Sequence, residues 1–303
     1  MRVLFMGTPY FARVVLEKIL NDPFFEVVGL FAQPDKPFGR KQELKYPETK
    51  EFIVKNKILL QIFQPEVLDE ESFQTISKLK PDVILVVAYG KILPKKILSF
   101  TKCLNIHGSV LPKYRGASPM HEMILNDDKI YGVSVIQLQE KLDSGDILGI
   151  SAFKSEKSFN LESLMLKLAE MGSKLAIKVL KNLEVLEPLK QHQADATYCK
   201  KIFKNQGLVD FEDARSIYLK SLAYSVWPNV FLENGLKLFE VELVSEMGKY
   251  QKGEILSIDG NAAVIGCLQG VLRIEMLQYP GKQKMDAKTY IQGKRLKIGD
   301  ILV

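Results

Sequence analysis

Three polar side chains of this sequence, an amide, an imidazole and a carboxylate, are of the types that could converge on one reacting centre. Asn105 and His107 stand two positions apart in the short apolar run C-L-N-I-H, which stops at Gly108. Successive strand residues face opposite sides, so the amide and the imidazole share one face, about 6.6 Å apart along the chain. The third side chain is Asp143, in the acidic turn L-D-S-G-D that follows another apolar run.

Together these three groups predict a site that activates a bound donor for direct attack. An amide donor and an imidazolium can stabilise an oxygen that becomes negative. A carboxylate within about 4–6 Å of the ring favours the charged imidazole. Taken alone, Asp143 and Asp146 would be interpreted as caps of their own turn. With Asn105 and His107 beside it, Asp143 completes a catalytic set.

A covalent nucleophile and a metal are both disfavoured. Cys103 shares the face of His107, but four extended residues separate the two by about 13 Å, which indicates a core cysteine. Ser109 lies outside any G-x-S-x-G elbow. The three histidines, His107, His121 and His192, are far apart and lack metal-ligand spacing.

The elements that would position this site alternate between strands and helices. Strands are expected near 3–5, 27–32, 58–63, 83–88, 103–107 and 133–137, and helices near 12–20, 48–56, 69–79, 119–125 and 161–180. The continuous apolar run 83–88 is typical of a central parallel strand. This alternation predicts an α/β fold with a doubly wound, mostly parallel, Rossmann-like sheet. G-x-G-x-x-G is absent and only Gly7 follows the first strand, so a dinucleotide site is unfavourable.

The alternation of strands and helices ends after residue 188. Residues 189–208 are polar and unpatterned, and beyond a short helix near 213–223 come strands near 237–244, 253–258, 262–267 and 271–277. We therefore expect a catalytic domain over 1–189, a linker over 190–208 and a small OB-like β-barrel domain over 209–303. Between residues 33 and 47 we expect a long, basic loop without regular structure, of the kind that is functional or disordered.

Composition bounds the class of protein. The 303 residues are 47% hydrophobic and 26% charged, with a net charge of +6 and three cysteines. An odd cysteine number does not suit a disulfide framework, and neither a signal peptide nor a bilayer-spanning run is present, so a cytoplasmic protein without a membrane partner is expected. The basic stretch 282–297 would be either a solvated surface or a phosphate-contacting patch.

Several motifs together resemble the folate-dependent formyltransferases. They are N-I-H-G-S-V-L-P-K-Y-R-G-A-S-P from Asn105, V-V-A-Y-G-K-I-L-P from Val86, and L-D-S-G-D. The opening G-T-P-Y-F-A, the Q-P-D-K-P-F-G-R-K loop and Trp227-Pro228 extend the resemblance over nearly the whole chain. Within that family the match is closest to the branch that acts on initiator methionyl-tRNA.

The resemblance implies formyl transfer from the co-substrate 10-formyltetrahydrofolate to the α-amine of methionyl-tRNA, without a metal. Asn105, His107 and Asp143 fall on the family's catalytic positions, and Arg40 and Lys41 lie in the loop that would meet the tRNA. By the same analogy the protein would be a monomer, with a second domain that binds tRNA. The residues expected to contact folate are Ser109, Val110, Leu111, Pro112, Tyr89, Gly90, Ile92 and Leu93.

Other functions stay open. The acceptor could be a small amine, such as an amino sugar or glycinamide ribonucleotide, or water could replace it and release formate. A non-catalytic RNA-binding protein on the same scaffold is a rival from another class, although a binder would need none of the three catalytic side chains.

Overall fold

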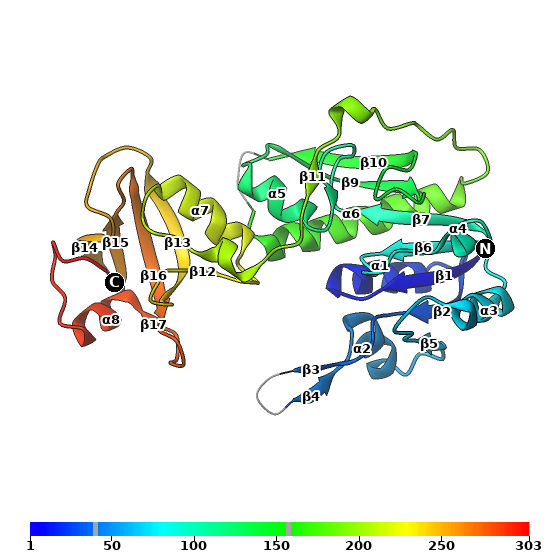
Figure 1. Cartoon of the computed structure of the whole chain (residues 1–303), viewed down its shortest axis with the longest axis horizontal. Helices are drawn as coiled ribbons and strands as arrows, with labels where there is room; N and C mark the ends of the chain where they lie inside the picture. The colour runs from blue at the N-terminus through cyan, green and yellow to red at the C-terminus, as the bar shows by residue number, and fades with distance from the viewer. Residues whose placement is uncertain (39–41, 156–158, 303) are drawn as a thin grey trace. The chain divides into compact units, whose positions relative to one another are not determined.

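The computed structural model describes residues 1–38, 42–155 and 159–302 (Figure 1). Contacts group the chain into two compact units. The first comprises Met1–Pro119, Ile130–Lys154 and Met165–Cys199, and the second Met120–Lys129, Ser155–Leu164 and Lys200–Val303. The expected segments 1–189, 190–208 and 209–303 remain a prediction of how the chain divides into independently folding parts.

The first unit is built on a seven-stranded sheet with the order β10-β9-β7-β6-β1-β2-β5. β5, β2, β1, β6 and β7 are parallel, whereas β9 runs antiparallel to β7 and β10 antiparallel to β9. This confirms the predicted mostly parallel sheet. The bounds are β1 Arg2–Gly7, β2 Glu26–Phe31, β5 Ile62–Phe63, β6 Val83–Val87, β7 Lys102–His107, β9 Ile130–Gln137 and β10 Ile147–Lys154.

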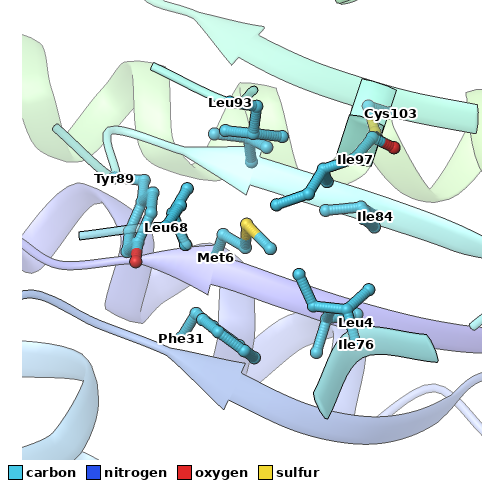
Figure 2. Packing of buried hydrophobic residues seen from close by; sticks show 11 residues of the cluster. Leu4, Met6, Phe31, Leu68, Ile76, Ile84, Tyr89, Leu93, Ile97 and Cys103 are labelled. Carbon is cyan, nitrogen blue, oxygen red and sulfur yellow. Dashed lines mark hydrogen bonds between the residues drawn. The ribbon is translucent and has the colours of Figure 1, made fainter. Parts of the chain in front are cut away.

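Helices cover both faces of this sheet. Leu4, Met6 and Ile84 pack with Ile76 of α3 and Ile97 of α4 on one face (Figure 2). On the other face α6 approaches closely enough that a side chain at Gly172 would meet Ile106 and Val133. Both faces are therefore apolar, which explains the uninterrupted hydrophobic strands. The helices of this part of the chain are α1 Tyr10–Leu20, α2 Glu48–Lys55, α3 Glu70–Leu79, α4 Lys95–Leu98, α5 Pro119–Leu125 and α6 Leu161–Lys181.

Several short or edge elements were not predicted, and three of them concern this part of the chain: β10, β3 and β4. β10 is half-exposed along its second half, so its side chains carry no continuous apolar run. Part of the stretch expected to be an irregular loop is a hairpin of β3 (Lys36–Phe38) and β4 (Glu43–Lys45). The expectation of an irregular loop was wrong for these strands. Their charged and proline residues form no apolar run, so the sequence shows no strand pattern here. Arg40 and Lys41 lie outside the described residues.

The second unit carries an antiparallel sheet with the order β12-β13-β16-β15-β14, and β17 also pairs with β16. The predicted strands correspond to β13, β14, β15 and β16, and the predicted helix is α7, so the β-rich second part is confirmed. The bounds are α7 Ala214–Ala223, β12 Val230–Phe231, β13 Lys237–Ser245, β14 Glu254–Asp259, β15 Ala262–Gly266, β16 Val271–Gln278, β17 Met285–Asp286 and α8 Ala287–Gly293.

The segment that follows α6, residues 189–199, is more ordered than its sequence suggests. Leu189 forms an antiparallel bridge with Ile147. Further along, β11 (Tyr198–Cys199) pairs in parallel with β8 (Arg115–Gly116). Residues 189–199 thus belong structurally to the sheet-bearing unit.

Candidate active site

β7 places Asn105 and His107 side by side at the carboxyl end of the parallel strands. Both pair across to β9, Asn105 with Ile136 and His107 with Ser134. Both side chains are buried, with 9% of Asn105 and 5% of His107 exposed. The carboxyl edge of an open α/β sheet is where ligands bind, so the strand delivers an amide and an imidazole to the expected place.

Asp143 reaches the same place by an indirect route. β9 is antiparallel to β7, and its last residue, Gln137, lies opposite Leu104 rather than beside His107. The turn therefore has to lead back toward Asn105. Asp143 adopts φ +47°, and at Gly145 a Cβ would come within 1.7 Å of the Gln137 carbonyl oxygen. Only a glycine at 145 lets the turn close this tightly.

The carboxylate of Asp143 touches all the expected partners. Its Oδ2 lies 3.6 Å from His107 Nδ1 and accepts a 2.9 Å hydrogen bond from the Gly116 N–H. Its Oδ1 accepts a long, 3.5 Å contact from Asn105 Nδ2. The structure thus brings Asn105, His107 and Asp143 together.

The other ring nitrogen of His107 also faces the protein. Nε2 lies 2.8 Å from the Tyr114 carbonyl oxygen, which can only accept, so Nε2 carries the proton in this arrangement. The imidazole is held between a carboxylate and a carbonyl. Each ring nitrogen therefore faces an oxygen atom.

The loop after His107 is fixed by its own hydrogen bonds. The Ser134 hydroxyl donates to the Ser109 carbonyl and accepts from the Leu111 N–H, while the Ser109 hydroxyl donates to the Lys113 carbonyl at 2.6 Å. Ser109 and Leu111 are buried, and Val110 and Pro112 are partly exposed. These hydrogen bonds tie the loop after His107 to Ser134 of β9.

The other predicted folate residues lie after β6 and divide into two groups. Tyr89 and Leu93 belong to the buried cluster with Met6 and Leu68 (Figure 2), whereas Ile92 is 80% exposed. Gly90 adopts φ +85°, which turns the chain out of the strand. Burial raises the pKa of Tyr89 to about 12, and its hydroxyl has no hydrogen-bond partner within the described ranges.

The expectation that Cys103 belongs to the core is confirmed. Cys103 is 2% exposed within the same cluster (Figure 2), and burial raises the pKa of its thiol to about 12. The thiol is therefore protonated at neutral pH and is a poor nucleophile. Among the described residues no group of three or more His, Cys, Asp or Glu could hold a metal ion. In the same residues, no helix is both long and apolar enough to cross a membrane.

Some contacts of this site come from residues that the sequence did not single out. Gln191 Nε2 donates to the Asp143 carbonyl at 2.9 Å and to the Gly145 carbonyl at 2.7 Å. The Thr197 hydroxyl accepts from the Tyr114 N–H at 2.8 Å. Both lie in the stretch expected to be a linker, where no periodicity marks them.

Comparison with known proteins identifies the family. A sequence model described as "Formyl transferase" matches residues 1–180, and one described as "Formyl transferase, C-terminal domain" matches residues 201–295. This chain belongs to the formyl transferase family. The resemblance drawn from the motifs is thereby confirmed, and the protein is a formyl-transferring enzyme.

Individual relatives of this formyl transferase agree with the family match. The chain is 55% identical to "Methionyl-tRNA formyltransferase" of Helicobacter pylori over 302 residues, covering 100% of both chains. The solved "Methionyl-tRNA formyltransferase from Clostridium thermocellum" has a TM-score of 0.56 at 18% identity and covers 80% of this chain and 93% of its own. HypX from Aquifex aeolicus, in complex with tetrahydrofolic acid, has a TM-score of 0.66 at 18% identity. That alignment covers 99% of this chain and 49% of HypX.

Proposed function

We propose that this formyl transferase moves the formyl group of 10-formyltetrahydrofolate onto the α-amine of initiator methionyl-tRNA, in the cytoplasm and as a monomer. The observation that carries the chemistry is the buried convergence of Asn105, His107 and Asp143 at the end of β7. The choice of acceptor is supported by the full-length relatives, which are named methionyl-tRNA formyltransferases.

Asn105 is assigned to the developing oxyanion. The neutral amine attacks the formyl carbon, a new C–N bond forms, and the formyl oxygen becomes negative. The Asn105 amide makes only a 3.5 Å contact with Asp143, so it can turn an N–H toward that oxygen. When the intermediate collapses, the bond from carbon to N10 of the folate breaks.

His107 is assigned to the proton balance of this exchange. One proton must leave the attacking amine and one must reach N10 of the leaving folate, and an imidazole can carry it. Asp143 stabilises the charged ring from the Nδ1 side. To serve the reacting atoms, Nε2 must exchange the Tyr114 carbonyl for substrate, so we expect this 2.8 Å hydrogen bond to break on binding.

The residues flanking the cluster are assigned to the two substrates. Ser109, Val110, Leu111 and Pro112, in the hydrogen-bonded loop after His107, are proposed to contact folate. The unpartnered Tyr89 hydroxyl and the adjoining apolar Leu93 suit a flat heteroaromatic ring that carries polar groups, with Gly90 and Ile92 at its border. Arg40 and Lys41 are proposed to contact the tRNA, on the basis of the motif resemblance.

One assay tests the proposal against its rivals. Purified protein is supplied with 10-formyltetrahydrofolate and one of four acceptors: methionyl-initiator tRNA, uncharged tRNA, small amines (an amino sugar nucleotide and glycinamide ribonucleotide), or water alone. We expect formyl-methionyl-tRNA as the product and little free formate. Formylation of a small amine, release of formate, or tRNA binding without any product would each overturn the proposal in favour of the corresponding alternative.

A further inference from the structure

Residues 189–199 act as a strap across the catalytic loop. We use "strap" for this segment, which starts at the Leu189–Ile147 bridge and ends at β11. Between these two anchors it supplies hydrogen bonds to the loop 112–117 and to the turn that carries Asp143. The motif-bearing part of the site therefore depends on a segment that carries no motif.

One end of the strap fixes the residue that holds His107. Thr197 accepts from the Tyr114 N–H through its hydroxyl, and its carbonyl accepts from the Arg115 N–H at 2.8 Å. Tyr114 adopts φ +60°, which is unfavourable for a residue with a side chain and needs support from its surroundings. The carbonyl of this same Tyr114 faces His107 Nε2.

The other end of the strap fixes the carboxylate partner. Gln191 donates both of its amide hydrogens, one to the Asp143 carbonyl and one to the Gly145 carbonyl. Asp143 also has a positive φ, +47°. One glutamine thus bridges the turn that aims the carboxylate at His107 Nδ1.

The centre of the strap is locked by a buried cation. Arg115 is 1% exposed, and its guanidinium donates to Gln191 Oε1 at 3.0 Å, to Gln193 Oε1 at 2.9 Å and to the Tyr198 hydroxyl at 3.3 Å. A buried cation is costly unless its donors are satisfied. Gln191 therefore has two separable roles, because its oxygen serves Arg115 while its nitrogen serves the Asp143 turn.

We propose that Gln191 is a positioning residue for formyl transfer, acting through the orientation of Asp143. Its Nε2 hydrogens hold the turn in the strained conformation from which the carboxylate reaches both His107 and the Gly116 N–H. The statement about catalysis rests on the proposed function, whereas the statement about the turn rests on the hydrogen bonds alone.

Two matched substitutions separate the roles of Gln191. Gln191→Glu keeps an oxygen for Arg115 but places a second oxygen against the Asp143 and Gly145 carbonyls. Gln193→Glu makes the same chemical change at a residue whose side chain bonds Arg115 and the Tyr198 hydroxyl rather than the turn. We expect Gln191→Glu to lower kcat about 10- to 100-fold with little change in KM for either substrate, and Gln193→Glu to stay within about twofold of wild type.

A readout without substrate accompanies the kinetics. The Gly116 amide donates to Asp143 Oδ2, so hydrogen–deuterium exchange at Gly116 reports whether the carboxylate is in place. We expect faster exchange at this amide in Gln191→Glu and wild-type exchange in Gln193→Glu, with both proteins folded by circular dichroism. If Gly116 exchange and kcat in Gln191→Glu match wild type, or if both glutamates behave alike, the positioning role is overturned. If wild type makes no formyl-methionyl-tRNA, the proposed function fails, and the exchange data alone decide whether Gln191 holds the turn.

Discussion

The imidazole of His107 is held at both nitrogens, and this distinguishes it from a histidine that merely fills the core. The Asp143 carboxylate lies 3.6 Å from Nδ1, and the Tyr114 carbonyl oxygen lies 2.8 Å from Nε2. The side chains of His107 and Asp143 are both buried. The carboxylate lies beyond ordinary hydrogen-bond length, so its effect is mainly that of a nearby charge. Each ring nitrogen therefore faces an oxygen of the protein, which fixes the orientation of the imidazole.

Replacing either member of this pair should remove catalysis without unfolding the protein. We expect His107→Ala and Asp143→Asn to lower kcat about 10²–10³-fold, because each removes a polar or charged group from the position where charge develops in the reaction. Binding of tetrahydrofolate, followed by calorimetry, should change little. Single-turnover formylation of methionyl-tRNA measures the loss.

A neighbouring acid provides the control for this pair. Asp146 lies in the same turn, and its described contact is through the backbone carbonyl, which accepts from the Gln137 N–H. Asp146→Asn should therefore retain near wild-type turnover. Near wild-type turnover in Asp143→Asn would show that the assigned carboxylate is the wrong one.

His121 predicts how the protein responds to acid. Burial lowers its pKa to about 4, and its Nδ1 has no partner in the part of the chain that the structure describes. In the unfolded chain the ring titrates near 6.5, so the unfolded state gains protons first as the pH falls. The free energy of unfolding is therefore unaffected by His121 above about pH 6.5. As the pH falls toward 4, protonation of His121 in the unfolded chain lowers it by up to about 3 kcal/mol.

The prediction is tested by urea denaturation of wild type and His121→Gln at pH 7 and pH 4.5. The substitution removes the titrating group, so the variant should lose less stability between the two pH values than wild type does. His192→Gln is the matched control, because the His192 side chain is 79% exposed. An identical pH dependence in wild type and His121→Gln would show that His121 is accessible to protons.

At the scale of elements, the two-stranded pairing of β8 with β11 has the greatest influence on the site. It is only two residues long on each side, yet it carries Gly116, whose N–H binds Asp143. Gly116 adopts φ +125°, and a Cβ there would lie 2.1 Å from the Cys199 carbonyl oxygen. Both facts require glycine.

Gly116→Ala should therefore separate β11 from β8. We expect at least about a 10-fold loss of kcat, because the clash with the Cys199 carbonyl displaces the backbone N–H of residue 116 from Asp143, together with a loss of about 1–3 kcal/mol of unfolding free energy from the strained backbone. Gly281→Ala is a suitable control for backbone strain alone, since Gly281 also has a positive φ, +75°, but has nothing within 4 Å. A Gly116→Ala protein with wild-type kcat would contradict the role given to this pairing.

The elements also show what a sequence can and cannot predict. β6 and β7 were predictable because burial on both faces leaves a continuous apolar run, and Asn105 and His107 followed from the period of a strand. Asp143 was predicted from its turn, although β9 is antiparallel and delivers it by a longer path. The strap was missed because its contacts are hydrogen bonds from glutamine and threonine, which leave no periodic signal.

At the scale of the whole molecule, a lysine or arginine is available to bind a nucleic-acid phosphate only where no carboxylate of the protein already pairs with it. In the basic stretch 282–297, Lys284 forms a 2.8 Å ion pair with Glu240. Lys294 lies over the rings of Tyr279 and Tyr290. A cation held beside the exposed ring of Tyr279 can contact a nucleic-acid backbone without first breaking an ion pair.

We expect this difference to appear in the salt dependence of tRNA binding. The Lys294→Ala, Arg295→Ala double variant should lower the magnitude of the slope of log K against log salt by about 1–2, because each lost phosphate contact contributes about 0.9 on a duplex. Lys284→Ala should leave the slope nearly unchanged. Filter binding between 50 and 200 mM salt measures it, and equal slopes in all three proteins would favour a solvated surface.

The distance along the chain between the loop and its strap has a consequence for the order of synthesis. Thr197 follows its partner Tyr114 by 83 residues, and Gln191 follows Asp143 by 48. A nascent chain emerges N-terminus first, so all seven strands of the main sheet are complete before the strap exists. The hydrogen bonds from Gln191 and Thr197 to the Asp143 turn and to Tyr114 can therefore form only after every strand of the sheet has been synthesised.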